Sequence, residues 1–302
     1  MKILISGGSG FIGSNLAKSF LENGNQVHVL LRSGSHLNES SLNNGIIRHI
    51  VTSSSSPSEI LKLIQKISPN VVIHAATKFV AQHKSSDIDE IIDANVTFGT
   101  HLLEAVMRSG LSLEFININS SWQNFQEHQR NARTLYAASK IAFNEILNYY
   151  SSVSNFAARS VVLFDTYGPL DTRRKVVDVL IEAAMHKRPL DMSDGYQLIN
   201  LTHVDDVCDA IKMLAYSNYE NLETFQIKSP DTISIRQLVA IIEEISGEKA
   251  MVNWGGLESR PYEMTFDWNV ATDLPGWEPK ISLRSGLLEK VAAFRLHSDT
   301  RI

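Results

Sequence analysis

The 302-residue sequence contains one cysteine, Cys208, and no long run of apolar residues. A single cysteine excludes an internal disulfide framework and fits a reducing compartment. No apolar segment approaches the roughly 18 residues that a membrane-spanning helix needs, and the chain opens on a strand-like segment without the charged and apolar regions of a secretion signal. From these absences we expect a soluble, cytoplasmic protein that does not bind membranes.

An excess of positive charge is also missing. The chain has 28 lysine and arginine residues against 33 aspartate and glutamate residues, a formal net charge of −5, and no long basic run. A nucleic-acid partner is therefore not expected. No spacing of histidine, cysteine and aspartate is typical of a zinc site, and His74 and His203 fall at strand or helix edges, where we expect them to fill core space. We expect no bound metal.

The most informative pattern lies in the first thirteen residues. Apolar residues predict a buried strand from Lys2 to Ser6 and an amphipathic helix from Phe11 to Asn23. The glycines between them have the spacing Gly8-x-Gly10-x-x-Gly13 and also Gly7-x-x-Gly10-x-x-Gly13. A dinucleotide-binding turn needs glycine where the chain reverses, where a pyrophosphate approaches the backbone and where the helix meets the strand. Because the helix start also attracts phosphate, we expect cofactor contacts at Gly7, Gly10, Phe11 and Ile12.

Strands and helices are predicted to alternate over the first 120 residues. Further strands are predicted at 26–31, 46–51, 71–75 and 113–119, with helices at about 57–67 and 88–108. This alternation is typical of a Rossmann-type α/β fold with a doubly wound parallel sheet. The remaining length suits a smaller C-terminal α/β lobe.

The end of the second strand bears on the choice between NAD and NADP. An acidic residue about 20 positions after the glycines binds the ribose 2′-hydroxyl of NAD. Here Leu31 occupies that place and Arg32 follows it. Because a guanidinium binds a 2′-phosphate that a carboxylate would repel, we favour NADP(H), with Arg32 and Ser33 as ligands, while NAD remains open. Arg32 as an ordinary solvated residue also remains open.

Groups suited to proton transfer follow the fifth strand. Ser120, Ser121 and Trp122 stand at its end, and Tyr136 and Lys140 are spaced i and i+4 on a predicted helix. A nearby ammonium lowers the pKa of a phenol and makes it a usable proton donor or acceptor. Ligands of open parallel sheets bind at these strand ends.

At this point the sequence resembles the extended short-chain dehydrogenase/reductases that act on nucleotide sugars. The likeness covers nearly the whole chain and rests on several short motifs in order: the glycine turn, Val-Ile-His-Ala-Ala at 72–76 followed by Lys78, the segment from Asn95 to Thr100, the Ser/Tyr/Lys set, Tyr-Gly-Pro at 167–169 and His-Val-Asp-Asp-Val at 203–207. The resemblance implies a dinucleotide-binding domain at 1–165, to which elements from about 199–227 return, and a mainly substrate-binding lobe at 166–302.

The resemblance also implies roles for individual residues. Ser121, with Ser120 as the alternative, and Tyr136 would contact the sugar oxygen, and Lys140 would also hold the nicotinamide ribose while hydride passes between the sugar carbon and nicotinamide. Implied cofactor contacts are Ala75, Ala76, Lys78, Asn95, Tyr136 and Lys140. Implied substrate contacts are Ser121, Trp122, Gln123, Asp165 and Arg260.

Departures from the family pattern narrow the chemistry. Trp122, Gln123 and Asn124 stand where sugar 4,6-dehydratases carry an acidic pair, which disfavours dehydration. Cys208 falls inside a predicted helix, which disfavours the ketosugar 3,5-epimerase/reductases that need a catalytic cysteine. Ile199 and Asn200 replace an Arg-Asp pair of the family, so Arg260 becomes the main candidate to bind a nucleotide diphosphate. The basic run at 173–175 is an alternative, as a diphosphate contact or as a solvated helix start.

We therefore expect NADPH-dependent reduction of a nucleotide-linked 4-keto-(6-deoxy)hexose, with Tyr136 as proton donor. An NAD-dependent nucleotide-sugar 4-epimerase uses the same residues and is the first alternative. A non-catalytic NADP(H)-binding regulator is an alternative of another class. A homodimer through helices at about 88–108 and 134–150 is implied by the resemblance alone.

Overall fold

The computed structural model describes residues 1–35, 45–51, 55–128, 130–169, 171–217, 220–260 and 262–299. The chain forms two compact units. The first contains residues 1–163, 208–226 and 270–274, and the second contains residues 164–207, 227–269 and 275–302. Both units are therefore assembled from separate stretches of sequence.

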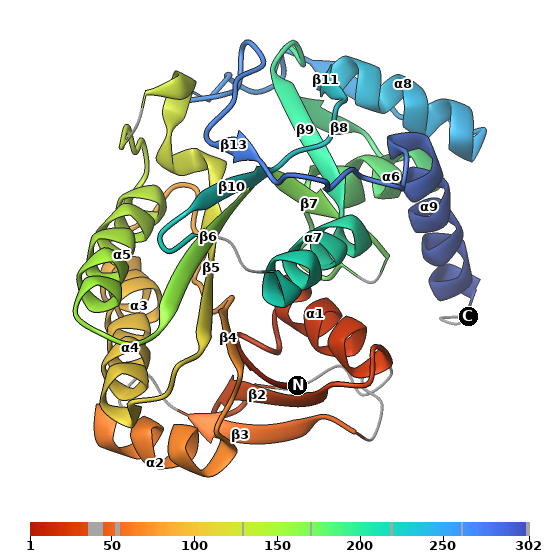
Figure 1. The fold of residues 1–302 in the computed structure, drawn as a ribbon. Helices are drawn as coiled ribbons and strands as arrows, with labels where there is room; N and C mark the ends of the chain where they lie inside the picture. Colours follow the sequence, from red (N-terminus) through yellow and green to blue (C-terminus); the bar gives the residue numbers. More distant parts are fainter. Residues whose placement is uncertain are drawn as a thin grey trace. The chain divides into compact units, whose positions relative to one another are not determined.

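An eight-stranded sheet forms the centre of the first unit (Figure 1). Its order is β13-β10-β6-β5-β4-β1-β2-β3. The ladders from β3 through β6 are parallel, as is the ladder between β10 and β13. This sheet confirms the predicted doubly wound, Rossmann-type fold. The strands are β1 (Lys2–Ser6), β2 (Gln26–Arg32), β3 (Ile47–Val51), β4 (Val71–His74), β5 (Glu114–Ser120), β6 (Ala157–Leu163), β10 (Thr224–Ile227) and β13 (Thr272–Asp273).

Helices cover both faces of this sheet. On one face lie α2 (Pro57–Ile67), α4 (Phe98–Ser109) and α5 (Leu135–Ser152), and on the other lies α1 (Phe11–Glu22) (Figure 1). α2 begins at a capping box formed by Ser56 and Glu59, and α4 ends at Gly110 with φ +68°. The core between α2, α4, α5 and the sheet is apolar and includes Leu4, Val72, Phe115, Ile60, Ile64, Leu102, Phe143 and Leu147.

The helical segment predicted over 88–108 is confirmed, and it contains a π-helical turn. α3 (Ile88–Ile92) leads into a π-helical turn at Asp93–Thr97 before α4 begins. Asn95 lies in this turn and is buried. Such turns often occur at functional positions. The side-chain hydrogen bonds of Asn95, described below, depend on its position in this π-helical turn.

The second unit has two small sheets. β7 (Asp165–Tyr167), β9 (Leu198–His203) and β11 (Thr232–Ser234) form one, and β8 (Leu190–Met192) pairs with β12 (Val252–Trp254) in the other. α6 (Val176–His186), α8 (Ile235–Ser246) and α9 (Leu283–Asp299) supply the apolar side chains that pack on them. This is the smaller α/β lobe that was predicted. α7 (Val204–Tyr216) begins in the second unit and continues into the first.

The His-Val-Asp-Asp-Val motif has a structural role in the second unit. The Asp206 carboxylate accepts hydrogen bonds from the backbone N–H groups of Lys280 and Ile281 at 2.9 and 3.0 Å. The Trp277 indole donates to the Asp206 carbonyl at 3.2 Å. These contacts fasten the segment before α9 to the start of α7.

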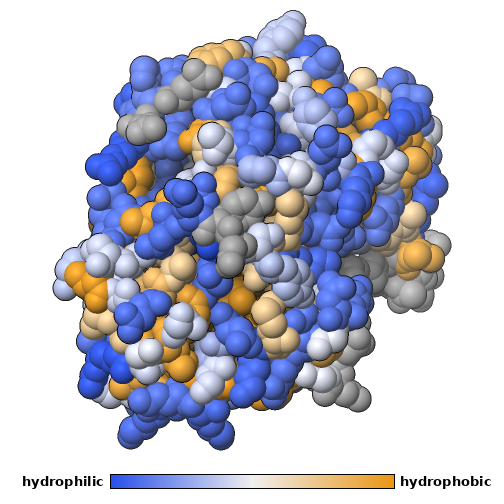
Figure 2. All heavy atoms as spheres, viewed as in Figure 1, coloured by the Kyte–Doolittle hydropathy of each residue, from blue (hydrophilic) through white to orange (hydrophobic). Residues whose placement is uncertain are grey.

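The face shown in Figure 2 is mostly hydrophilic, with hydrophobic side chains scattered over it. In the described part of the chain, no helix has the length and apolar character to cross a membrane. Within the same residues, no group of three or more His, Cys, Asp and Glu side chains is arranged to hold a metal ion.

Candidate active site

The glycine turn leaves no room for side chains. A Cβ added at Gly13 would lie 2.2 Å from the carbonyl oxygen of Gly7, and one added at Gly7 would lie 2.6 Å from the backbone nitrogen of Ala76. Gly7 also has φ +72°, a region that favours glycine. Gly10 differs, because its φ is −77° and an added Cβ would be 3.3 Å from the Gly7 oxygen. Gly10 has no side chain to cap α1, so this bare turn at the helix start fits a cofactor diphosphate.

Residues after β4 lie directly against this turn. The Ala75 backbone N–H donates to the Ser6 carbonyl at 3.2 Å, and that of Ala76 donates to the Ser6 hydroxyl at 3.4 Å. The structure therefore brings Ala75 and Ala76 beside Gly7, and Phe11 and Ile12 form the start of α1. These predicted cofactor contacts form one cluster at the ends of β1 and β4.

Asn95 holds the next loop in place. Its side-chain oxygen accepts from the Thr77 hydroxyl at 2.9 Å and the Lys78 backbone N–H at 2.7 Å. Its side-chain nitrogen donates to the Lys78 carbonyl at 3.1 Å and the Ser139 hydroxyl at 2.9 Å. Because these four bonds use the full capacity of an amide, the side chain of Asn95 positions Lys78 and links this loop to α5.

Arg32 and Lys78 share one carboxylate partner, Glu90 of α3. The Lys78 ammonium lies 2.9 Å from one Glu90 oxygen, and the Arg32 guanidinium lies 3.6 Å from the other. The hydrogen bond from Lys78 is the main cause that lowers the pKa of Glu90, and Arg32 adds to it. Ser33 follows Arg32 in an exposed turn. The sequence did not indicate Glu90, because in the sequence it looks like any acidic residue on the exposed face of a helix.

Tyr136 and Lys140 lie on α5, whose first turn is capped by the Thr134 hydroxyl, accepting from the Ala137 backbone N–H at 3.1 Å. Both side chains are buried. The Lys140 ammonium donates to the Ile118 carbonyl at 2.7 Å. Burial lowers the pKa of Lys140 to about 8, because removal from water disfavours the charged form.

Three asparagines join α5 to β5 beside this lysine. The Asn144 side-chain oxygen accepts from the side-chain nitrogens of Asn117 and Asn119, each at 2.9 Å. Asn117 also donates to the Asn119 side-chain oxygen at 3.1 Å. Asn117 and Asn119 share a strand face, and Asn144 stands one helical turn after Lys140. The buried Asn117 and Asn119 and the partly buried Asn144 thus fix α5 against β5 near the Lys140–Ile118 contact.

The two serines at the end of β5 differ in their surroundings. The Ser120 hydroxyl accepts from the Trp122 backbone N–H at 3.4 Å and caps the short helical turn Ser121–Gln123. Within the part of the chain that is described, the buried Ser121 makes no side-chain hydrogen bond, which favours Ser121 over Ser120 as the hydroxyl available to a ligand. The buried Gln123 side-chain nitrogen likewise has no partner among the described residues. Buried donors without partners are rare unless a ligand or water completes them.

Phe79 covers Tyr136 with an apolar ring. The ring centroids of Phe79 and Tyr136 are 4.9 Å apart with an edge-to-face angle of 79°, and Phe79 meets Trp122 in the same way at 5.5 Å and 81°. Phe79 is itself 40% exposed. Sequence reasoning missed Phe79, although it directly follows Lys78 in a segment already linked to the cofactor.

His74 fills core space, as the sequence indicated. Its side chain is fully buried, and its Nδ1 lies 2.8 Å from the Ser6 hydroxyl oxygen. The ring centroids of His74 and Phe143 are 4.8 Å apart. Burial lowers the pKa of His74 to about 3, and the Lys140 charge contributes. His74 is therefore neutral at ordinary pH.

In the second unit, the charges of three cations act on Asp165 of β7. Burial raises the pKa of Asp165, and the charges of Lys175, Arg173 and Arg260 oppose that rise. Arg173 is already bound, because its Nε and Nη2 donate to the Asp171 carboxylate at 2.8 and 2.7 Å. Arg260 is exposed. The charge of Arg260 therefore acts on Asp165, and the role of both residues as substrate contacts stays a prediction.

Asn200, which stands in place of a family aspartate, has a structural role. Its side-chain nitrogen donates to the Ser229 carbonyl at 2.7 Å and the Thr232 hydroxyl at 2.9 Å, and its oxygen accepts from the Ser229 backbone N–H at 3.0 Å. Asn200 therefore joins β9 to the connection before β11.

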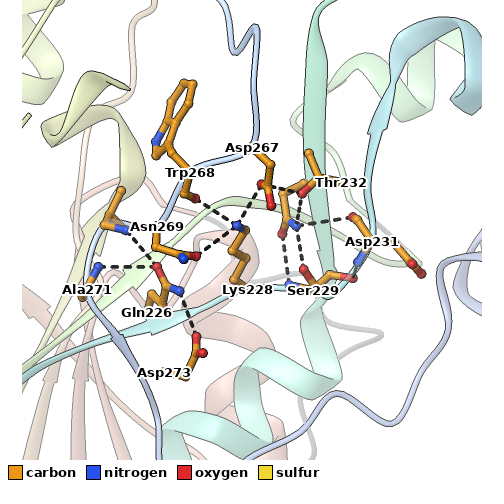
Figure 3. Close-up of polar contacts among 12 residues, drawn as sticks. Gln226, Lys228, Ser229, Asp231, Thr232, Asp267, Trp268, Asn269, Ala271 and Asp273 are labelled. Atoms are coloured by element: carbon orange, nitrogen blue, oxygen red, sulfur yellow. Dashed lines mark hydrogen bonds and ion pairs between the residues drawn. The ribbon is translucent and has the colours of Figure 1, made fainter. Parts of the chain in front are cut away.

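Polar contacts also fasten the stretch that follows Arg260 (Figure 3). The Lys228 ammonium donates to the Trp268 carbonyl at 2.9 Å and lies 2.8 Å from the Asp267 carboxylate. In the first unit, the Gln226 side chain donates to Asp273 at 2.8 Å and accepts from the Val270 backbone N–H at 2.9 Å (Figure 3).

Comparison with known proteins finds a matching family and relatives that are similar over most of the chain. The model of the NAD dependent epimerase/dehydratase family matches residues 3–227. A CDP-abequose synthase of Yersinia pseudotuberculosis is 29% identical over 260 residues, which cover 84% of this chain and 88% of that protein. A CDP-abequose synthase of Salmonella typhimurium is 25% identical over 298 residues, covering 95% and 96%.

Among solved structures, the UDP-glucuronic acid 4-epimerase of Bacillus cereus, in complex with UDP-glucuronic acid and NAD, matches with a TM-score of 0.85. The match covers 98% of this chain and 100% of that one at 23% identity. At this identity the likeness establishes the fold.

Proposed function

Because this chain belongs to the NAD dependent epimerase/dehydratase family, as an NAD(P)-dependent enzyme of the extended short-chain dehydrogenase/reductase type, we propose that it reduces a nucleotide-linked 4-keto-(6-deoxy)hexose with NADPH. Buried Tyr136 and Lys140 share a helix face at the end of β5, and the pKa of Lys140 is lowered to about 8, which supports proton transfer in a reductase and in a 4-epimerase alike. The choice of reduction rests on Arg32 at the end of β2, because a guanidinium binds the 2′-phosphate of NADPH, the cofactor that suits net reduction. The two CDP-abequose synthases, named for making a CDP-linked sugar, support a nucleotide sugar as substrate.

The protein's own groups handle the proton. When bound, NADPH supplies the hydride that adds to the ketone carbon. Tyr136 gives its phenolic proton to the ketone oxygen, so that C=O becomes CH–OH, and the Ser121 hydroxyl donates a hydrogen bond to that oxygen. The Lys140 ammonium stabilises the phenolate that remains. The Ile118 carbonyl holds Lys140 in place for this role.

The remaining predicted contacts divide by ligand. Gly7, Gly10, Phe11, Ile12, Ala75 and Ala76 would hold the cofactor diphosphate, and Arg32, Ser33 and Lys78 its adenosine phosphate. Trp122 and Gln123 would contact the sugar, supported by the unpartnered Gln123 nitrogen. In the second unit, Asp165 and Arg260 would bind the nucleotide, supported by the charge of Arg260 near Asp165.

The Tyr136→Phe variant tests this proposal. Consumption of NADPH is followed by its absorbance with CDP-, UDP-, dTDP- and GDP-linked 4-keto-6-deoxyhexoses. We expect the variant to lose about 10²- to 10⁴-fold in kcat, the usual contribution of a positioned acid, while NADPH still produces a thermal shift. Equal turnover by wild type and variant would contradict the proposal.

A 4-epimerase is the second candidate, favoured by the fold likeness to an epimerase solved with NAD. Retention of NAD through purification, with no NADPH consumed on any ketosugar and interconversion of 4-epimers, would select it. If Tyr136→Phe left every activity and phenotype untouched, the non-catalytic NADP(H)-binding regulator would replace both.

A further inference from the structure

One carboxylate stands between the two cations assigned to the adenosine phosphate of the cofactor. Glu90 lies 2.9 Å from the Lys78 ammonium and 3.6 Å from the Arg32 guanidinium, each through a different oxygen. The three side chains come from the end of β2, the loop after β4 and α3. All are partly exposed: Arg32 is 67%, Glu90 49% and Lys78 34% accessible to solvent.

The backbones that carry Lys78 and Glu90 are fixed. Both the N–H and the carbonyl of Lys78 are bonded to the Asn95 side chain. Glu90 is followed by Ile91, which is fully buried and anchors α3. The carboxylate is thus presented to Lys78 and Arg32 from an anchored helix.

Charge makes this carboxylate a competitor for phosphate. The pKa of Glu90 is lowered, first by its hydrogen bond with Lys78 and also by Arg32, so Glu90 is ionised at neutral pH. A phosphate monoester carries about −1.5 to −2 charge there. A 2′-phosphate bound by Arg32 and Lys78 must therefore displace Glu90 or face it at close range. A ribose 2′-hydroxyl, in contrast, donates readily to a carboxylate.

We propose that Glu90 is a specificity-determining residue that limits the preference for NADP(H) over NAD(H). Glu90 competes with the 2′-phosphate of NADP(H) for Arg32 and Lys78. With NAD(H) it accepts a hydrogen bond from the ribose 2′-hydroxyl, a role that an acidic residue at the end of β2 would otherwise fill and that β2 lacks here. The inference rests on the proposed function in one respect, the placement of the adenosine ribose beside Arg32 and Lys78.

The test compares cofactor binding to wild type and Glu90→Gln by calorimetry. Probes are NADP⁺, NAD⁺, 2′-AMP and AMP. We expect Glu90→Gln to bind NADP⁺ and 2′-AMP about tenfold tighter, as loss of two exposed charge interactions allows, and to bind NAD⁺ no tighter. The gain should shrink at high salt. Glu90→Ala, which has no amide to offer the phosphate, should change the NADP⁺/NAD⁺ ratio in the same direction.

Glu22→Gln is the matched control, because Glu22 is similarly exposed on α1 and pairs with Lys18 at 3.9 Å. Its binding ratio should equal that of wild type. An unchanged ratio in Glu90→Gln, or weaker NADP⁺ binding, would overturn the inference and make Glu90 a support for the two cations.

These measurements need no sugar substrate. If Glu90→Gln shifts the ratio but no ketosugar is reduced, Glu90 keeps its role and the proposed reaction fails. If a ketosugar is reduced with NADPH but Glu90→Gln leaves the ratio of NADP⁺ to NAD⁺ affinity unchanged, the proposed reaction stands and the role of Glu90 fails.

Discussion

Lys140 carries a charge where the fold disfavours one. Its buried ammonium donates to the Ile118 carbonyl, and burial lowers its pKa to about 8. His74, whose pKa is also affected by Lys140, stays neutral. A buried cation lowers the stability of the fold, and strongly shifted pKa values are common at functional sites, which agrees with the role proposed for Lys140.

Lys140→Met should show this cost. The unfolded chain keeps the lysine proton up to a pKa of about 10.5 and the folded chain only to about 8. Between these values the unfolded state binds more protons, so the stability of the folded state rises with pH, and below pH 8 the penalty is constant at about 3 kcal/mol. Lys140→Met also removes the hydrogen bond to Ile118, which costs about 1 to 2 kcal/mol of stability and offsets part of this gain.

We therefore expect Lys140→Met to be inactive, yet at least as stable as wild type at pH 7. The variant should also lack the increase in stability from pH 8 to 10. Urea unfolding at several pH values measures both. A variant clearly less stable than wild type at pH 7 would show that Lys140 contributes to folding.

At the scale of elements, two glycines in the turn between β1 and α1 are needed for different reasons. Gly13 allows the helix to pack on the Gly7 carbonyl, whereas Gly10 has an ordinary φ and an added Cβ there would make a milder contact, 3.3 Å from the Gly7 oxygen. The first is a requirement of packing, and the second leaves the backbone open to a ligand.

Gly13→Ala and Gly10→Ala should therefore fail differently. Gly13→Ala places Cβ 2.2 Å from a backbone oxygen and should lower the free energy of unfolding by about 3 kcal/mol or more. Gly10→Ala should change it by less than about 1 kcal/mol but abolish the NADPH thermal shift. Urea unfolding without cofactor and thermal shift with NADPH measure the two effects. A Gly13→Ala protein as stable as wild type would contradict this account.

What the sequence could predict follows from how local each feature is. The strand–turn–helix at the start and the Tyr136–Lys140 pair depend on spacing within one or two elements, so a linear pattern reveals them. Phe79 follows Lys78 in the loop held by Asn95, and Glu90 lies on α3, directly before the π-helical turn that contains Asn95. Two partners of Asn95, Lys78 and Ser139, lie 17 and 44 residues away in the sequence. No periodicity records such contacts. The asparagines of β5 were read as strand residues, because only the packing of α5 shows that they face Asn144.

At the scale of the whole molecule, the residues proposed to bind the cofactor and those proposed to bind the nucleotide belong to different units. Gly7, Lys78 and Lys140 lie in the first unit, and Asp165 and Arg260 lie in the second. Each ligand should therefore respond to substitutions in one unit more than in the other.

Arg260→Ala tests this division. With CDP, UDP, dTDP and GDP as probes, a nucleotide that binds the wild type raises its melting temperature by mass action. Arg260→Ala should lose most of that rise, with about tenfold weaker binding, the usual effect of losing a charged hydrogen bond, and keep the full rise produced by NADPH. Arg284→Ala, which removes an exposed arginine paired with Glu244 on α8, is the control and should keep both. Loss of the NADPH response in Arg260→Ala would contradict the division.

The order of the strands has a consequence for synthesis. β6 lies between β5 and β10 in the finished sheet, but β10 is made about 60 residues later and β13 only near residue 272. While the ribosome translates the intervening stretch, β6 is an open edge, the kind of surface that chaperones and aggregation partners recognise. A premature stop codon before residue 272 would therefore remove β13 from the sheet of the first unit, in addition to shortening the second unit.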